Sequence, residues 1–254
     1  MSSGFVIVAE NSEKVDYVSC AIACAQSLRS FGQSVSIITS SDIKESVFDE
    51  VIKPNSSNVK NDIFNVGVDM QVYDLSPYDR TFKVEADMYF PQDISYWWDS
   101  FACDDIKVCG TIRDLHGEIS YDRTYRHFID ANNLPDVYNA ITYFSKNERA
   151  KLFFNTIQEI VDNWDRIKSL LQCDPDERIT TDWVYSLACN ILGERSYYPK
   201  GIGPSFVHMK QNIIKSRQED WTKCMVLEKN PVRINTFPQL YPVHYVVKDA
   251  YVKF

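Results

Sequence analysis

The sequence has no hydrophobic run approaching the roughly 20 consecutive apolar residues that a helix needs to cross a bilayer. Residues 1–4 also lack the basic and apolar regions of a secretory signal peptide. The seven cysteines form no Cys-x-x-Cys pair, and an odd number on a long chain argues against a disulfide framework. We therefore expect a cytoplasmic protein with reduced cysteines and no membrane partner.

Glycine is also scarce, with 8 among 254 residues, and no glycine-rich loop follows the first apolar run at residues 5–9. The dinucleotide-binding fingerprint and the P-loop both need such glycines, because the backbone approaches the phosphates closely there. Neither motif is present. Any nucleotide must therefore be bound by other means.

Positive charge is in deficit overall, with 27 Lys and Arg against 35 Asp and Glu, a net charge of −8. Residues 200–254 nevertheless contain nine Lys and Arg against four Asp and Glu, or +5, which leaves −13 for residues 1–199. A basic final segment is typical of a segment that closes over a diphosphate or of a surface that binds a polyanion. Ordinary scatter of charge explains it equally well.

What is present is an ordinary globular composition, 44% hydrophobic and 24% charged, with enough apolar residues for a large core. A strand at 5–9, a helix at 16–31 and a strand at 35–39 form a βαβ beginning, which favours a parallel sheet. The other expected elements are helices at 42–48, 64–73, 145–165 and 181–193, and strands at 50–53, 82–84, 108–112, 137–144 and 205–208. The fold class expected is α/β, with a central, mainly parallel sheet flanked by helices.

The segment 75–88 reads as a turn and a short strand followed by two carboxylates, Glu85 and Asp87. Residues two apart on a strand point the same way, so both carboxylates can face one cation. Taken alone, the pair is more often a solvated sheet edge. Its interpretation depends on the rest of the chain.

Taken together in order and spacing, these segments resemble the glycogenin-like family of retaining glycosyltransferases, over roughly residues 5–210. The matching positions are Tyr17 with Ser27-Leu28, residues 46–52, Leu75 and Tyr78, Glu85-Ala86-Asp87 at the family's Asp-x-Asp, Asn139, Asp182, and 206–208 with His208. The resemblance implies the GT-A fold, in a domain at 1–210 followed by a basic C-terminal tail at 211–254 on or near the active face. It also implies a nucleotide-sugar donor, with a UDP-sugar expected.

The resemblance further implies roles for individual side chains. Glu85, Asp87 and His208 are expected to bind Mn²⁺ or Mg²⁺, since two carboxylates and an imidazole suit these ions. The expected donor-binding residues are Asn11, Tyr17, Glu85, Ala86, Lys210 and Lys215, with Tyr17 stacked on the base. Asn139 and Asp182 are expected to line the sugar as catalytic residues. Since no side chain is an obvious nucleophile, front-face attack by the acceptor hydroxyl is the expected route to retention.

Three departures from the family pattern stand out. Glu85 replaces the first aspartate, and Asp69 falls where the family has a basic residue. The family's histidine, glycine, lysine and tryptophan motif survives only as His208, Gln211, Lys215 and a displaced Trp221. These changes bear on the diphosphate contacts and on the identity of the sugar.

The acceptor has several candidates. One candidate acceptor is a hydroxymethylated base of phage DNA, such as hydroxymethylcytosine, in the host cytoplasm. The basic tail motivates it, as do four basic or histidine residues in the unassigned segment 113–133, namely Arg113, Arg123, Arg126 and His127. A glycan, protein or small-molecule hydroxyl is the other. A catalytically inactive GT-A binding module is the alternative function. A nucleotidyltransferase is disfavoured because the glycine-rich loop is missing.

Overall fold

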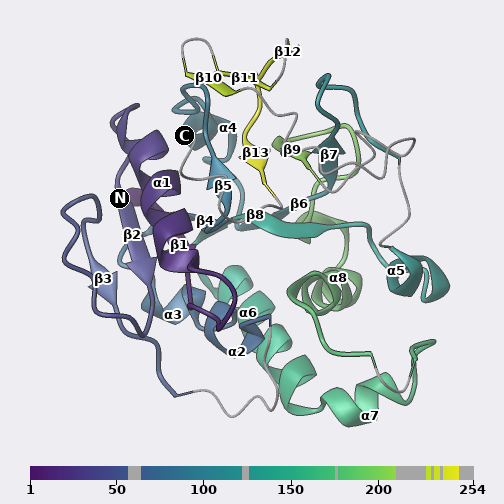
Figure 1. Ribbon diagram of the computed structural model, residues 1–254. Coiled ribbons are helices and arrows are strands. Elements are labelled where there is room, and N and C mark those ends of the chain that lie inside the picture. Colours follow the sequence, from purple (N-terminus) through teal and green to yellow (C-terminus); the bar gives the residue numbers. More distant parts are fainter. Residues whose placement is uncertain are drawn as a thin grey trace.

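The computed structural model describes residues 1–56, 64–121, 126–174, 177–209, 227–229, 232–234 and 237–245. Its centre is a six-stranded sheet in the order β3-β2-β1-β4-β8-β6 (Figure 1). The strands are β1 (Ser3–Val8), β2 (Val35–Ile38), β3 (Val51–Ile52), β4 (Arg80–Glu85), β6 (Ile106–Cys109) and β8 (Tyr138–Ser145). β3, β2, β1 and β4 run parallel, and β8 is antiparallel to β4 and β6. The expected mainly parallel α/β sheet is confirmed.

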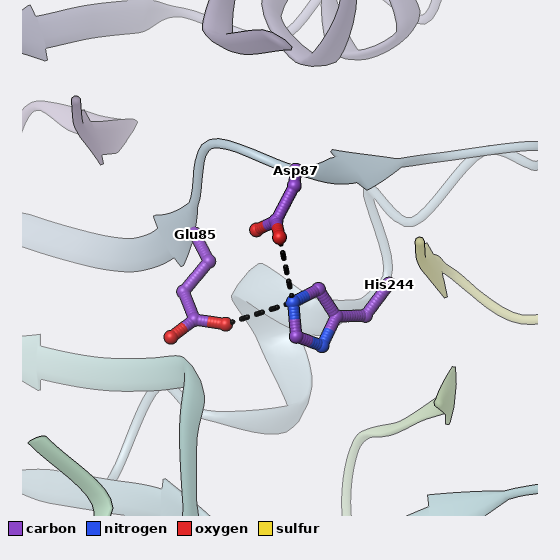
Figure 2. Close-up of side chains that lie close together, drawn as sticks. All are labelled: Glu85, Asp87 and His244. Atoms are coloured by element: carbon purple, nitrogen blue, oxygen red, sulfur yellow. Dashed lines mark ion pairs between the residues drawn. The ribbon is translucent and has the colours of Figure 1, made fainter. Parts of the chain in front are cut away.

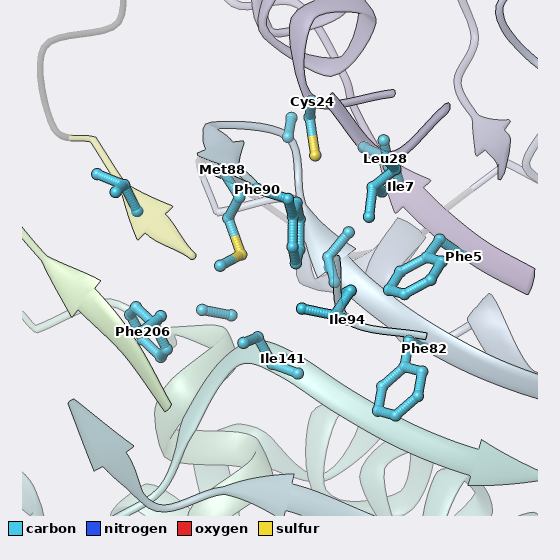
Figure 3. Packing of buried hydrophobic residues seen from close by; sticks show 14 of the residues in the cluster. Phe5, Ile7, Cys24, Leu28, Phe82, Met88, Phe90, Ile94, Ile141 and Phe206 are labelled. Atoms are coloured by element: carbon cyan, nitrogen blue, oxygen red, sulfur yellow. The ribbon is translucent and has the colours of Figure 1, made fainter. Parts of the chain in front are cut away.

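Helix α1 (Tyr17–Arg29) covers one face of this sheet (Figure 1). The Asp16 carboxylate caps it by accepting from the Ser19 backbone N–H at 3.0 Å, as N-cap residues do. Cys20, Cys24 and Leu28 recur at helical spacing and are fully buried. Alternation along β1 sends Phe5 and Ile7 to the same side as these residues, and this shared core is drawn in Figure 3.

Helices α6 (Glu148–Asp162) and α8 (Thr181–Leu192) cover the opposite face, where Val6 of β1 points. Asn147 caps α6 and Thr180 caps α8. The remaining helical elements are short: α2 (Val66–Asp69), α3 (Val72–Leu75), α4 (Trp97–Ser100), α5 (His127–Ala131), α7 (Trp164–Lys168) and the 3-10 turn Glu194–Ser196. Among the described residues, no helix combines the length and apolarity that a membrane crossing needs.

A second sheet lies beside the C-terminal end of β4 and has the order β5-β13-β9-β7. Its strands are β5 (Met88–Tyr89), β7 (Thr111–Arg113), β9 (Ser205–His208) and β13 (Val243–His244). β13 comes from the tail and pairs with β5 on one side and β9 on the other. A third, small sheet contains β10 (Leu227–Lys229), β11 (Val232–Ile234) and β12 (Phe237–Pro238).

Several sequence-based expectations for local structure are wrong, among them the single strand expected at 108–112, which is divided between β6 and β7 in different sheets. Residues 42–48 form no helix. The next residue, Asp49, instead accepts from the Val35 backbone N–H at 2.9 Å and pairs with Arg29, which ties this connection to the sheet. The helix expected at 64–73 is replaced by the one-turn helices α2 and α3.

Candidate functional site

Glu85 and Asp87 lie at the edge of the main sheet where its parallel strands end. Glu85 is the last residue of β4 and pairs in register with Val8, the last residue of β1. Asp87 follows after one buried residue, Ala86. Open α/β sheets bind ligands beyond the carboxyl ends of their strands, so the pair occupies a favourable place for a site.

His244 of β13 joins the two carboxylates, as Figure 2 shows. Its Nε2 lies 3.2 Å from Oε2 of Glu85 and 3.1 Å from Oδ2 of Asp87. One candidate ligand atom from each residue lies within 4.8 Å of the others. Asp87 and His244 are buried, whereas the Glu85 side chain is 29% exposed. Among the described residues, this triad is the group whose geometry suits a metal ion.

The backbone around β13 holds His244 in place. The Tyr245 N–H donates to the Asp87 carbonyl oxygen at 3.0 Å, and His244 pairs in register with Met88. His208, the histidine that the sequence pointed to, is the register partner of His244 on β9. Their ring centroids are 4.8 Å apart. The structure thus groups the carboxylates with His244 and places His208 beside the triad.

A cavity of about 310 Å³ opens next to the triad. Its lining contains Glu85, Asp182 and His208 from the sequence-based site, together with His244. Aromatic side chains form much of the remaining wall, namely Phe64, Tyr138, Trp183 and Phe206. These residues from six separate parts of the sequence therefore meet in one cavity.

Asp182 enters this cavity from the first turn of α8, just after the Thr180 cap. Its Oδ1 accepts from the Asn139 backbone N–H at 2.9 Å, and its Oδ2 accepts from Arg126 Nη1 at 2.8 Å. The Asn139 side chain is fully buried, and its amide donates to Asp69 Oδ2 at 3.2 Å. Asn139 therefore contacts Asp182 through its backbone, while its amide faces a buried cluster.

That cluster contains Lys83, whose Nζ lies 2.5 Å from Asp69 Oδ2. The Tyr185 hydroxyl donates to Asp69 Oδ1 at 2.6 Å. Burial, together with the Asp69 charge, raises the pKa of Tyr185 well above its usual value, so this tyrosine stays protonated. Asp69 is therefore the anionic partner of a buried cation. The glycogenin-like family, which the sequence resembles, has a basic residue at the matching position.

Two of the expected donor-binding residues, Asn11 and Tyr17, lie in the loop before α1 and at its first position. Tyr17 is its first residue and is half-buried, and burial together with the nearby charge of Glu85 raises its pKa. The Asn11 side-chain oxygen accepts from the Val18 backbone N–H at 2.9 Å, which holds the preceding loop against the helix. Lys210 and Lys215 lie outside the described residues.

Sequence reasoning missed His244, Arg126 and the aromatic wall. His244 lies between the apolar residues Val243 and Tyr245, a brief alternation that is the one trace of a strand at this position. From the sequence, Arg126 is expected only as one of the basic residues of segment 113–133 that motivate a DNA acceptor. The structure instead gives it carboxylate partners from two other segments, Asp136 and Asp182.

No family model matches the sequence, and no curated protein matches it. Among solved structures, the chain is similar to the galactosyltransferase LgtC in complex with donor and acceptor sugar analogs, with a TM-score of 0.58 and 10% identity. An active site mutant of LgtC gives a TM-score of 0.59 at 8% identity, and both matches cover 98% of this chain and 94% of the other. Mouse xyloside xylosyltransferase 1 gives 0.49 at 9% identity, covering 97% of this chain and 98% of that one. The chain has the GT-A fold. At such low identity the likeness establishes the fold alone.

Proposed function

We propose that the protein is a metal-dependent glycosyltransferase. It transfers a sugar from a nucleotide sugar, with a UDP-sugar as the expected donor, to an acceptor hydroxyl with retention of configuration. The observation that carries the proposal is the convergence of Glu85, Asp87 and His244 at the end of β4, beside a cavity that Asp182 also borders. The shared fold with a galactosyltransferase crystallised with donor and acceptor sugar analogs supports it.

The triad fits a divalent cation. Both carboxylates lie within 3.2 Å of the same imidazole nitrogen, so one ion can be bound by all three side chains. Two oxygen ligands and one imidazole suit Mn²⁺ or Mg²⁺, and the imidazole shifts the preference toward Mn²⁺. When bound, the ion stabilises the negative charge that develops on the leaving diphosphate. We assign the third ligand to His244, with His208 beside it in the cavity lining.

Different side chains bind the base and the sugar of the donor in this proposal. Tyr17, which lies near the charge of Glu85, is the proposed stacking partner of the base. Asp182 is the proposed acceptor for a sugar hydroxyl. Both acidic side chains of the cavity lining already have a role, Glu85 as a ligand of the proposed metal and Asp182 as an acceptor from Arg126 and the Asn139 backbone. Front-face attack by the acceptor hydroxyl is therefore the route to retention that we favour over a covalent intermediate.

A donor screen by nucleotide release, with and without Mn²⁺, tests this function. Release by the wild-type protein with at least one UDP-sugar, lost on chelation and in Asp87→Ala, is the expected result. Full activity of Asp87→Ala in chelator contradicts the metal site, and no release with any nucleotide sugar contradicts the function. A panel with hydroxymethylcytosine DNA, oligosaccharides, peptides and small hydroxyl compounds then identifies the acceptor.

His244→Ala and His208→Ala form a matched pair for the ligand assignment, because the two residues are register partners on neighbouring strands. Titration with Mn²⁺ should show a weaker affinity, by about 10-fold or more, for His244→Ala, whereas His208→Ala should bind nearly as the wild type. The reverse order of affinities assigns the ligand to His208 instead.

Glu85 at the place of the family's first aspartate motivates one alternative, an inactive GT-A module that binds a nucleotide without turning it over. Thermal stabilisation by UDP with Mn²⁺, in the absence of any hydrolysis or transfer, is the result that favours it.

A further inference from the structure

Arg126 lies between three segments at the wall of the cavity, and only 4% of it is exposed. Its Nε donates to Asp136 Oδ1 at 2.8 Å, its Nη1 donates to Asp182 Oδ2 at 2.8 Å, and its Nη2 donates to the Val137 carbonyl oxygen. Its guanidinium carbon also lies 4.1 Å from the centre of the Tyr138 ring. The side chain thus joins the residues before β8 to the first turn of α8.

This arrangement depends on the shape of a guanidinium. A planar fork presents several N–H groups in fixed directions, so one side chain can bind two carboxylates and a carbonyl at once. A lysine ammonium is a point charge and cannot reproduce that geometry. Although burial alone lowers the pKa of Arg126, the charges of Asp182, Tyr138 and Asp136 raise it overall, which keeps the cation in place.

The consequence for Asp182 is that both of its oxygens are held from different directions. Arg126 donates to Oδ2 and the Asn139 backbone donates to Oδ1, so the carboxylate cannot rotate about its terminal bond without breaking a hydrogen bond. Each carboxylate oxygen has more than one acceptor site, so the remaining lone pairs can face the cavity. Asp182 is in this way a fixed acceptor for a hydroxyl donor.

We propose that Arg126 is the positioning residue for the donor sugar, acting through the Asp182 carboxylate. The inference rests on the proposed function, in which Asp182 binds the sugar. Three of the five N–H groups of Arg126 donate to protein groups, one of them to Asp182, and this contact is the route by which we infer that Arg126 acts on the ligand. Loss of Arg126 should disturb the placement of the donor's sugar and leave the affinity for the nucleotide unchanged.

The first test compares UDP with the active UDP-sugar in Arg126→Lys, Arg126→Met and the control Arg29→Met. Arg29 pairs with Asp49 away from the residues that line the cavity, so the control removes an Arg–Asp pair there, although a more exposed one than those of Arg126. Because small misplacements at a reacting centre cost about 100-fold in rate, kcat/KM should fall by roughly that factor in Arg126→Met and by less in Arg126→Lys. Affinity for UDP alone should stay at the wild-type value in both, and the control should retain full activity.

A double-mutant cycle with Asp182→Asn then tests whether the two residues act together. If Arg126 works through Asp182, the double variant loses no more activity than the more damaging single variant, because coupled residues are not additive. Losses that multiply, or UDP affinity falling in parallel with that for the UDP-sugar, overturn the inference. If Arg126→Met fails to fold, Arg126→Lys takes its place in the cycle, since it keeps the buried charge.

Different results would contradict the proposed function and the role of Arg126. A wild-type protein that neither binds nor turns over any nucleotide sugar removes the proposed function, and the role of Arg126 with it. A wild-type protein that is active, with Arg126→Lys and Arg126→Met indistinguishable from Arg29→Met, removes only the role of Arg126.

Discussion

The buried ion pair between Lys83 and Asp69 gives the sharpest prediction for stability. Lys83 is 1% exposed, and its Nζ lies 2.5 Å from Asp69 Oδ2. Changing Lys83 to Met keeps the length of the side chain but leaves the Asp69 carboxylate buried without its cation. Breaking a buried pair from one side typically costs about 3–5 kcal/mol, because the remaining charge is uncompensated. We expect the loss to lie in that range.

Two features of the cluster place limits on this magnitude. Tyr185 and Asn139 still donate to Asp69 after the change, which moderates the loss. Replacing both charges, in Lys83→Met with Asp69→Asn, leaves no buried ion. The double variant should therefore be more stable than the sum of the two single losses predicts, because contacting residues are coupled.

Urea unfolding and thermal melting measure the effect. For a chain of this size, each kcal/mol shifts Tm by about 2–4 °C, so the single variant should melt roughly 6–20 °C lower. Lys53→Met is the matched control, since Lys53 is 50% exposed and pairs with Asp42, which is 98% exposed. Exposed pairs contribute below about 1 kcal/mol. A Lys83→Met variant as stable as Lys53→Met, or strictly additive losses in the double variant, refutes the reasoning.

Two further predictions concern local packing and capping. Asp16→Ala should lose about 1 kcal/mol near neutral pH, whereas Asp16→Asn, which keeps an N-cap, should lose less. Hydrogen bonds from the Ser19 hydroxyl and backbone hold the pKa of Asp16 below 3.8, so its stabilising contribution is present above that pH and is lost as the pH falls further. Urea unfolding should show that the difference in the free energy of unfolding between Asp16→Ala and the wild type is smaller at acidic than at neutral pH. A difference that does not change with pH contradicts this. Gly4→Ala should cost about 1–3 kcal/mol, because its Cβ would lie 2.3 Å from the Tyr78 ring, whose hydroxyl is anchored to Ser36. The test measures the loss of unfolding free energy caused by Gly4→Ala in the wild type and in the Tyr78→Ala variant. Equal losses in the two exclude a clash with the Tyr78 ring.

Much of the fold follows from the sequence because β1, α1 and β2 carry strong local patterns. The apolar run at 5–9 is buried as a central strand. The spacing of Cys20, Cys24 and Leu28 correctly indicated the inward face of α1. Where tertiary contacts decide, the local pattern fails: residues 42–48 look helical, yet the hydrogen bonds of Asp49 at their end fix the chain against β2.

The site was partly predictable for a related reason. Glu85 ends a short strand and Asp182 lies in the first turn of a helix, both elements that the sequence indicated, and the structure brings both residues to one cavity. His208 also lines it, from a four-residue strand that the sequence correctly indicated. The hydrogen bonds that fix Asp182 come from Arg126 and Asn139, which lie 56 and 43 positions away. No spacing rule within the sequence connects those residues.

His244 could not be selected from the sequence because β13 has two residues, too few for a period. The strand exists because β5 and β9 pair with it from both sides, and β5 itself begins at the residue after Asp87. The same backbone hydrogen bond, from Tyr245 to the Asp87 carbonyl, therefore sets both the register of the tail and the approach of His244 to Asp87. If the triad binds a cation as proposed, metal binding is coupled to docking of β13, because the triad is complete only when β13 is in this register. Mn²⁺ should then protect β13 from hydrogen exchange in the wild type, but far less in Asp87→Ala.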